Sequence, residues 1–139
     1  MVGRDIDALE EAHASLHGTP GECSVISADL SEAEGVEQLI SSCGDVDVLI
    51  ANAGVTSAAE TGSLPRSEID RLTYLMGAGV VRLCEGVVPG MVARGGGTVV
   101  IVSSIAAFTP MRKSGPYAAS KAFSTCLLYT SPSPRDLDL

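Results

Sequence analysis

The stretch VDVLIANAG, residues 46–54, decides the fold. Its first part, Val46–Ala51, is apolar except for Asp47. A short apolar run without alternation is typical of a parallel strand that is buried on both faces. The sequence therefore predicts such a strand, followed at its carboxyl end by Asn52, Ala53 and Gly54.

Helical and strand patterns alternate on both sides of this strand. Such an alternation predicts the α/β class, with a doubly wound parallel sheet and helices on both of its faces. In chain order we expect a helix over Asp5–Leu16, a strand over Cys23–Leu30, a helix from Ser31 to about Cys43, the strand Val46–Ala51, a long helix over about Pro65–Ala93 with a bend near Pro89, a strand over Thr98–Val102 and a helix opened by Pro116.

The second of these helices begins with a capping-box pattern, Ser31–Glu34. The Ser31 side chain is expected to accept a hydrogen bond from the third helical N–H, while Glu34 reaches back to the start of the helix.

The composition favours one soluble domain. The chain has 139 residues, 45% of them hydrophobic and 4% aromatic, so an aliphatic core is expected. A formal net charge of -8 disfavours nucleic acid as a partner, because an acidic surface repels phosphate backbones. The absence of a signal-peptide pattern and of an uninterrupted apolar span predicts a cytoplasmic protein with no membrane partner. No metal site is expected, because the four cysteines form no C-x-x-C pair and His13 and His17 have no third ligand.

Distinctive residues follow the ends of three expected strands. In open parallel sheets, ligands bind outside the carboxyl ends of the strands. After the last of these strands comes YAASK, residues 117–121, in which Tyr117 and Lys121 share one face of a helix. The residues at the strand ends are Asp29 and Leu30, then Asn52, Ala53 and Gly54, then Ser103 and Ser104.

A tyrosine beside a lysine has a chemical use. A free tyrosine titrates near pH ~10, about three units too high for a base at neutral pH. Three units correspond to roughly 4 kcal/mol, and a cation at about 4 Å supplies about 4 kcal/mol at an effective dielectric near ~20. A tyrosine tuned in this way is a general acid or base, and a nearby serine hydroxyl stabilises charge on the substrate oxygen. Alone, Y-x-x-x-K also describes an ordinary surface helix.

The whole ordered set resembles the short-chain dehydrogenase/reductase family: NAG after one strand, SS after the next, then Y-x-x-x-K at a helix start. The resemblance extends from Val2 to about Thr125. It implies a Rossmann-like doubly wound sheet and an NAD(P)-dependent oxidoreductase that moves hydride between the nicotinamide and an alcohol or carbonyl.

The resemblance also assigns roles to single residues. Tyr117 matches the catalytic acid/base, Lys121 the lysine that lowers the tyrosine pKa and binds the nicotinamide ribose, and Ser104 the serine that orients the substrate. Ser104 is preferred to Ser103 because its spacing to Tyr117 fits the family better. Taken without the resemblance, Asp29 is also explained as a helix cap and Asn52 as a turn residue. The matches to cofactor-binding positions are Asp29 and Leu30 at the adenine, and Asn52, Ala53 and Gly54 in the motif that stabilises the sheet and lines the cofactor cleft.

Arg4 bears on the choice of cofactor. It lies where the second strand of the family passes into its helix. There an acidic residue binds the ribose hydroxyls of NAD, and a basic residue meets the 2′-phosphate of NADP. Gly3 stands at the acidic position, so the sequence favours NADP over NAD, with Arg4 as a contact. An ordinary surface arginine is the other explanation.

Two departures from the family concern the site itself. The glycine-rich turn T-G-x-x-x-G-x-G and the first strand before it are absent, so the pyrophosphate lacks its backbone N–H donors. By register with Gly79–Leu83, Met76 stands where the family has the asparagine of a proton relay. Core packing is the other explanation for Met76.

The C-terminal residues depart from the family altogether. Residues 126–136, CLLYTSPSPRD, are similar to translated adapter sequence from transposase-made sequencing libraries, and the prolines at 132 and 134 break a helix. We therefore expect a partial dehydrogenase domain over residues 1–125 and a non-native tail over 126–139. The first strand and the C-terminal strands of the sheet are expected to be missing.

Several functional hypotheses follow. The intact enzyme is expected to act on a small alcohol or carbonyl compound and to form a homodimer or homotetramer through its long middle helices, while the 139-residue chain alone is expected to be inactive. The alternatives are a non-catalytic nucleotide-binding or regulatory protein on the same fold, or an inactive fragment. Close contact between the middle helices is expected at Gly77, Ala78 and Gly79. Candidates for part of the substrate pocket are Phe108, Thr109, Met111 and Arg112.

Overall fold

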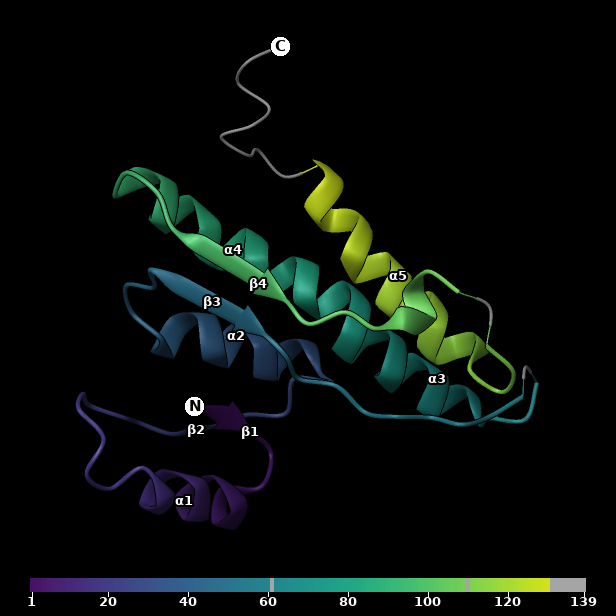
Figure 1. Ribbon diagram of the computed structural model, residues 1–139, viewed down its shortest axis with the longest axis horizontal. Coiled ribbons are helices and arrows are strands. Elements are labelled where there is room, and N and C mark those ends of the chain that lie inside the picture. Colours follow the sequence, from purple (N-terminus) through teal and green to yellow (C-terminus); the bar gives the residue numbers. More distant parts are fainter. Residues whose placement is uncertain (61, 110, 131–139) are drawn as a thin grey trace.

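A computed structural model describes residues 1–60, 62–109 and 111–130 (Figure 1). The predicted alternation of strands and helices is confirmed. Most of the predicted non-native tail, residues 131–139, lies outside the described residues. In chain order the elements are β1 (Val2–Gly3), α1 (Ile6–Ser15), β2 (Ile26–Ser27), α2 (Ala33–Ser42), β3 (Val48–Ala51), α3 (Arg66–Thr73), the π-helical turn η1 (Tyr74–Ala78), α4 (Gly79–Ala93), β4 (Thr98–Ile101), the 3-10 helix η2 (Ile105–Ala107) and α5 (Gly115–Thr130).

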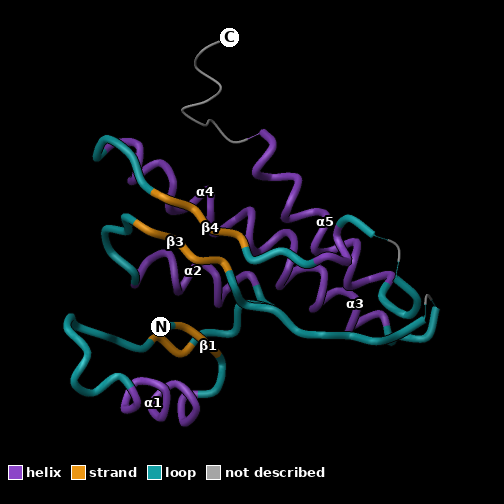
Figure 2. Tube along the Cα trace, in the orientation of Figure 1, coloured by secondary structure: helices purple, strands orange, loops and turns teal. Residues whose placement is uncertain are grey.

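The strands form two parallel pairs (Figure 2). Val2 of β1 lies opposite Ile26 of β2, and Val48 of β3 lies opposite Thr98 of β4. A doubly wound sheet has the strand order 3-2-1-4-5-6. Without strand 1, that order leaves the pairs 3-2 and 4-5, which correspond to β2–β1 and β3–β4. The pairing is therefore that of a doubly wound parallel sheet without its first strand, as the sequence predicts.

The core lies between α2, α4 and one face of the strands. Residues three or four apart on a helix share a face, so each helix buries one stripe of side chains. Leu49 of β3 and Val99 of β4 pack against these stripes, as do Val2 and Ile26 of the other pair. The buried cluster consists of Val36 and Leu39 from α2 and Leu83, Val87 and Met91 from α4.

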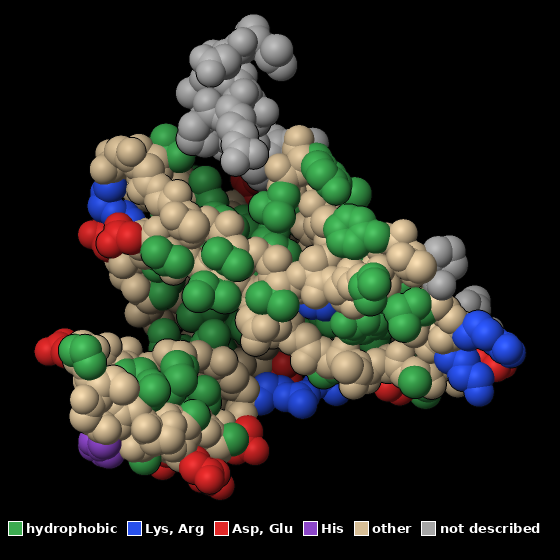
Figure 3. Space-filling model, in the orientation of Figure 1, with side chains coloured by type: hydrophobic (Ala, Val, Ile, Leu, Met, Phe, Trp, Pro, Cys, Tyr) green, Lys and Arg blue, Asp and Glu red, His purple; other side chains and the backbone are tan. Residues whose placement is uncertain are grey.

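The opposite face of β3 and β4 has no helical cover in the described part of the chain. Side chains on a strand alternate between its two faces. Val48, Ile50 and Val100, on this face, are 57%, 62% and 41% exposed. Figure 3 shows apolar side chains gathered over these strands. The helical cover predicted for both faces is therefore found on one face of this pair, while α1 packs on β1 (Figure 1).

α3, η1 and α4 form one continuous helix over Arg66–Ala93, close to the predicted range. Pro89 lies inside α4 and does not end it. Among the described residues this 28-residue helix alone is long and apolar enough to cross a membrane, judged by length and composition only. Core helices of soluble proteins meet the same criterion, and 39% of its most apolar window is buried within the molecule.

Two predictions near α2 need correction. The strand expected over Cys23–Leu30 is limited to Ile26–Ser27, because only these residues pair with β1. The capping box is wrong: α2 begins at Ala33, and its N-cap residue Glu32 makes no side-chain capping bond. The Ser31 hydroxyl donates to Asp29 instead. A local turn with Asp29 thus engages the side chain that the capping-box pattern assigns to the helix.

Candidate active site

A pocket of about 570 Å³ opens at the carboxyl ends of β1, β2 and β3. Its remaining wall comes from α3. Asn52, also predicted as a cofactor contact, does not line it: its backbone N–H donates to the Ile50 carbonyl, and the residue is exposed in a turn. In doubly wound sheets this edge is where nucleotides bind. The predicted cofactor contacts that do line the pocket are Arg4, Asp29, Leu30, Ala53 and Gly54.

Asp29, just after β2, is held by its own turn. Its Oδ1 accepts from the Ser31 hydroxyl at 2.6 Å and from the Ser31 backbone N–H at 2.9 Å. The second bond makes this an Asx turn. The hydroxyl bond is the largest cause that lowers the pKa of Asp29 below its usual 3.8, and the Arg4 and Arg71 guanidinium groups add to it. The pocket wall therefore carries a charged carboxylate at neutral pH.

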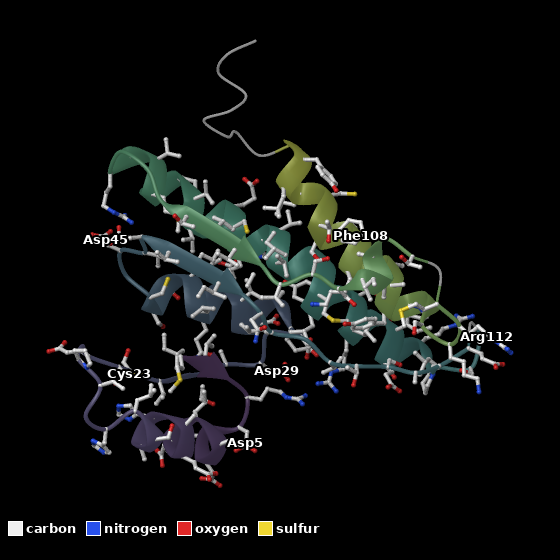
Figure 4. All side chains as sticks on the ribbon, in the orientation of Figure 1. Asp5, Cys23, Asp29, Asp45, Phe108 and Arg112 are labelled. Atoms are coloured by element: carbon white, nitrogen blue, oxygen red, sulfur yellow. The ribbon has the colours of Figure 1, made fainter. Side chains whose placement is uncertain are left out.

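Two guanidinium groups approach the other oxygen of this carboxylate. Arg4 Nη1 lies 4.0 Å and Arg71 Nη2 3.6 Å from Asp29 Oδ2. Both arginine side chains are about half exposed, at 58% and 48%. Figure 4 shows Asp29 at the junction between the β1–β2 pair and the rest of the molecule, and Figure 3 shows basic and acidic side chains gathered there. The two arginines and the Asp29 carboxylate thus lie together in the lining of the pocket.

Gly35 allows α2 to touch the pocket wall. A methyl group built on Gly35 would lie 2.0 Å from the Asp29 carbonyl oxygen, far inside any non-bonded contact distance. Only glycine fits at this crossing, because the obstacle is backbone. The contact fixes the backbone that carries the Asp29 carboxylate.

Two hydrogen bonds hold α5 on the end of β4. Lys121, which is 7% exposed, donates from Nζ to the Val102 carbonyl at 2.7 Å. The Ser103 and Thr125 hydroxyl oxygens lie 2.5 Å apart. Both bonds join the residues after β4 to α5, so they set the position of this helix relative to the sheet edge.

The elements that carry the three predicted catalytic residues pack against one another beside these bonds. Ser104 follows Ser103 directly, and its Oγ accepts from the Ala106 N–H at 3.2 Å, which caps η2. Tyr117 lies one helical turn before Lys121 in α5, against which η2 packs. Ser103 is engaged by Thr125, whereas Ser104 is free of any bond to α5 in the described part of the chain.

Met76 and Lys121 both approach Gly54. A methyl group built on Gly54 would lie 3.3 Å from the Met76 sulfur and 3.6 Å from Lys121 Nζ. Met76 is 1% exposed and belongs to the π-helical turn. The position predicted for the relay asparagine thus shares Gly54 as a neighbour with the lysine, and it carries a thioether, which is only a weak acceptor. Gly54 lines the pocket as well, so it connects the pocket with the lysine.

The glycines of the long helix serve contacts within the chain. A methyl group on Gly77 would lie 3.3 Å from the Phe123 ring of α5, and one on Gly79 would lie 2.8 Å from the Tyr74 carbonyl oxygen. Both glycines are buried. The close contacts that these two glycines permit within the chain are with α5 and with the preceding turn of the same helix, whereas contact between the middle helices of two subunits stays a prediction.

Arg71 and Ser31 are pocket residues that the sequence does not reveal. Arg71 belongs to no motif, and its proximity to Asp29 depends on how α3 packs. Ser31 has the pattern of a helix cap. One feature of the sequence does point to Ser31: it directly follows Asp29 and Leu30, in a turn at a strand end where ligand contacts are expected.

Similar sequences are found among proteins of known class. The family model described as short chain dehydrogenase matches residues 1–131. The dehydrogenase/reductase SDR family member 4 of Bos taurus is 37% identical over 120 residues, which cover 81% of this chain and 42% of that protein. The fatty acyl-CoA reductase of Acinetobacter baylyi is 31% identical over 137 residues, which cover 91% of this chain and 46% of that protein. The chain thus spans less than half the length of these relatives.

Solved structures agree with this grouping. A metagenomic short-chain oxidoreductase in complex with NADP matches with a TM-score of 0.86 and 25% identity, over 93% of this chain and 61% of that one. The L-sorbose reductase of Gluconobacter frateurii, complexed with NADPH and L-sorbose, matches with a TM-score of 0.83 and 31% identity, over 91% of this chain and 50% of that one. With strand pairing, pocket and both kinds of similarity in agreement, the chain belongs to the short-chain dehydrogenase family.

Proposed function

We propose that the protein carrying this chain is an oxidoreductase that transfers hydride between a nicotinamide cofactor and the carbon of an alcohol or carbonyl group. The observation that carries this proposal is the close approach of Lys121 Nζ to Gly54, which lines the pocket. The nucleotide-sized pocket and the Ser–Tyr–Lys set thereby share one edge of the sheet. The nicotinamide, when bound, supplies or accepts the hydride.

The pocket residues fit the adenosine end of such a cofactor. The charged Asp29 keeps Oδ2 free of hydrogen bonds to the described residues, so it is available to an amino or hydroxyl donor. Leu30, Leu72 and Leu75 supply apolar surface for a purine ring. Arg4, whose guanidinium has only a 4.0 Å contact, is available to a phosphate.

NADP is the cofactor that we propose. Arg4 lines the pocket, and Gly3 beside it adds no carboxylate that would repel a 2′-phosphate. The metagenomic oxidoreductase and the L-sorbose reductase were solved with NADP and NADPH, which supports the same choice.

The chemical step falls to residues at the end of β4. Tyr117 exchanges the proton with the substrate oxygen. Lys121 Nζ has three donors, of which the Val102 carbonyl takes one, so the others remain for a ribose hydroxyl, and the lysine lies one helical turn from Tyr117. Ser104 donates its hydroxyl proton to the substrate oxygen as negative charge develops there.

A tyrosine exchange tests this proposal in the protein expressed from the complete reading frame. NADPH consumption is followed over a panel of carbonyl compounds for Tyr117→Phe and for a control, Tyr74→Phe, whose hydroxyl oxygen is buried and which does not line the pocket. We expect Tyr117→Phe to lose roughly 100- to 10,000-fold in turnover, because the proton donor is gone. Tyr74→Phe should keep wild-type turnover. Near-normal turnover by Tyr117→Phe would remove the assignment.

One alternative, a non-catalytic nucleotide-binding protein, is supported by Met76 in place of a relay asparagine. Tight NADPH binding by the wild type, with no turnover on the whole carbonyl panel, would favour that alternative.

A further inference from the structure

Arg71 reaches across the pocket from α3 to the turn after β2. Its Nε and Nη2 atoms lie 3.3 Å and 3.2 Å from Ser31 Oγ, and Nη2 lies 3.6 Å from Asp29 Oδ2. The three residues all line the pocket, although Arg71 is forty positions away from Ser31 in the sequence.

The direction of these hydrogen bonds is fixed by chemistry. A guanidinium group only donates, and a serine hydroxyl has one proton and two lone pairs. Since Arg71 donates to Ser31 Oγ, the serine proton is left for Asp29 Oδ1, 2.6 Å away. The result is a chain of donors from Arg71 through Ser31 to Asp29.

This series of hydrogen bonds determines which oxygen of the Asp29 carboxylate can accept a bond from a ligand. Oδ1 accepts two bonds from Ser31, whereas Oδ2 accepts none from the described residues and has only the two guanidinium contacts at 3.6 Å and 4.0 Å. The carboxylate is therefore held in one rotational state with Oδ2 presented to a ligand.

We infer that Arg71 is a positioning residue of the nucleotide pocket: through Ser31 it orients the Asp29 carboxylate so that Oδ2 accepts a hydrogen bond from the adenosine part of the cofactor. This inference rests on the proposed function, since it takes the pocket to hold a nucleotide. It adds a residue of the long helix to a site otherwise built from strand ends.

The chain offers a matched control on the same continuous helix. Arg82 of α4 forms an ion pair of 2.6 Å with Glu37, and its side chain is 52% exposed, close to the 48% of Arg71. Arg82 does not line the pocket at the strand ends. Arg82→Ala therefore removes one charge and one exposed bond between α4 and α2 without touching Asp29, whereas Arg71→Ala removes one charge and the two part-buried bonds to Ser31.

Two measurements test the inference on Arg71→Ala, Arg71→Lys and Arg82→Ala. The first is the Kd for NADPH from its fluorescence. We expect Arg71→Ala to weaken binding by roughly tenfold, Arg71→Lys to recover part of that loss with its single ammonium donor, and Arg82→Ala to bind as the wild type does. The second is the pKa of Asp29 from carbon NMR, which should rise in Arg71→Ala and stay unchanged in Arg82→Ala.

The outcomes separate this inference from the proposed function. A wild type that does not bind NADPH contradicts the proposed function, and the NMR titration still decides whether Arg71 acts on Asp29. A wild type that binds NADPH, with Arg71→Ala binding equally well, overturns the inference. It is overturned as well if Asp29 titrates unchanged in Arg71→Ala, or if Arg82→Ala loses the same affinity.

Discussion

At the scale of the residue, Asp29 makes the free energy of unfolding depend on pH in the acidic range. Its pKa in the folded protein lies below 3.8, mainly because the Ser31 hydroxyl bonds the charged form. The stabilisation is therefore complete above the unfolded pKa of about 4 and is lost as pH falls through the folded pKa. We expect it to amount to at most about 1 kcal/mol, because a side chain that is 39% exposed is well screened.

The measurement is the free energy of unfolding in urea between about pH 2 and pH 7. Asp29→Asn should lie below the wild type at neutral pH and approach it in acid. Ser31→Ala, which removes the largest cause of the lowered pKa, should shrink the same pH dependence. Wild-type and Asp29→Asn curves that run parallel down to the acid end would contradict this account.

Residues also show where prediction from sequence succeeds. Arg4, Asp29, Leu30, Ala53 and Gly54 follow strand ends, and strand ends converge in a parallel sheet, so their common pocket is predictable. Asn52 is the exception, because it follows its strand end as an exposed residue that does not line the pocket. Ser31 and Arg71 escape prediction since their roles depend on a contact between α3 and the β2–α2 turn, and no local pattern encodes such packing. The roles of Ser104, Tyr117 and Lys121 stay predictions.

At the scale of the element, the helix Arg66–Ala93 has one buried and one exposed side. Met76 is 1% exposed in the π-helical turn, whereas Val92 of α4 is 69% exposed. Met76→Ala should lower the free energy of unfolding by about 2–5 kcal/mol, because a buried side chain leaves a cavity. Val92→Ala should change it by less than about 0.5 kcal/mol. Urea unfolding of both variants checks this, and equal losses would show that Met76 does not pack as described.

The same element illustrates what periodicity does and does not predict. Its length and its buried stripe follow from apolar spacing, and Pro89 is accommodated within it. The π-helical turn at Tyr74–Ala78 is not encoded in such spacing, because one extra residue per turn is a response to packing. The strand predicted over Cys23–Leu30 is too long for a related reason, since the length of a strand depends on the residues of the partner strand that pair with it.

At the scale of the whole molecule, the two faces of β3 and β4 differ in their surroundings. Leu49 packs against the core, while its neighbour Ile50 is 62% exposed. Ile50→Thr should leave the free energy of unfolding within about 0.5 kcal/mol of the wild type and reduce binding of an apolar dye. Leu49→Thr should cost about 1.5–3 kcal/mol.

Thermal or urea unfolding with dye fluorescence compares the two variants, which introduce the same residue at adjacent positions. A strong loss of stability in Ile50→Thr would mean that its face is covered. The doubly wound class follows from the sequence, but this one-sided cover follows only from the three-dimensional arrangement of the described strands and helices.

The weakly packed N-terminal unit has a consequence for ligand affinity. α1 has no buried residue, and β1 and β2 pair over two residues each. Segments with so few buried contacts open locally at a small fraction of the global unfolding free energy. Arg4 and Asp29 belong to this unit, so one wall of the pocket loses its structure whenever the unit unfolds locally. A nucleotide that binds only the closed wall must hold residues 1–30 in place. The affinity for the nucleotide and the amide-exchange protection of residues 1–30 therefore both depend on the equilibrium of local opening in these residues.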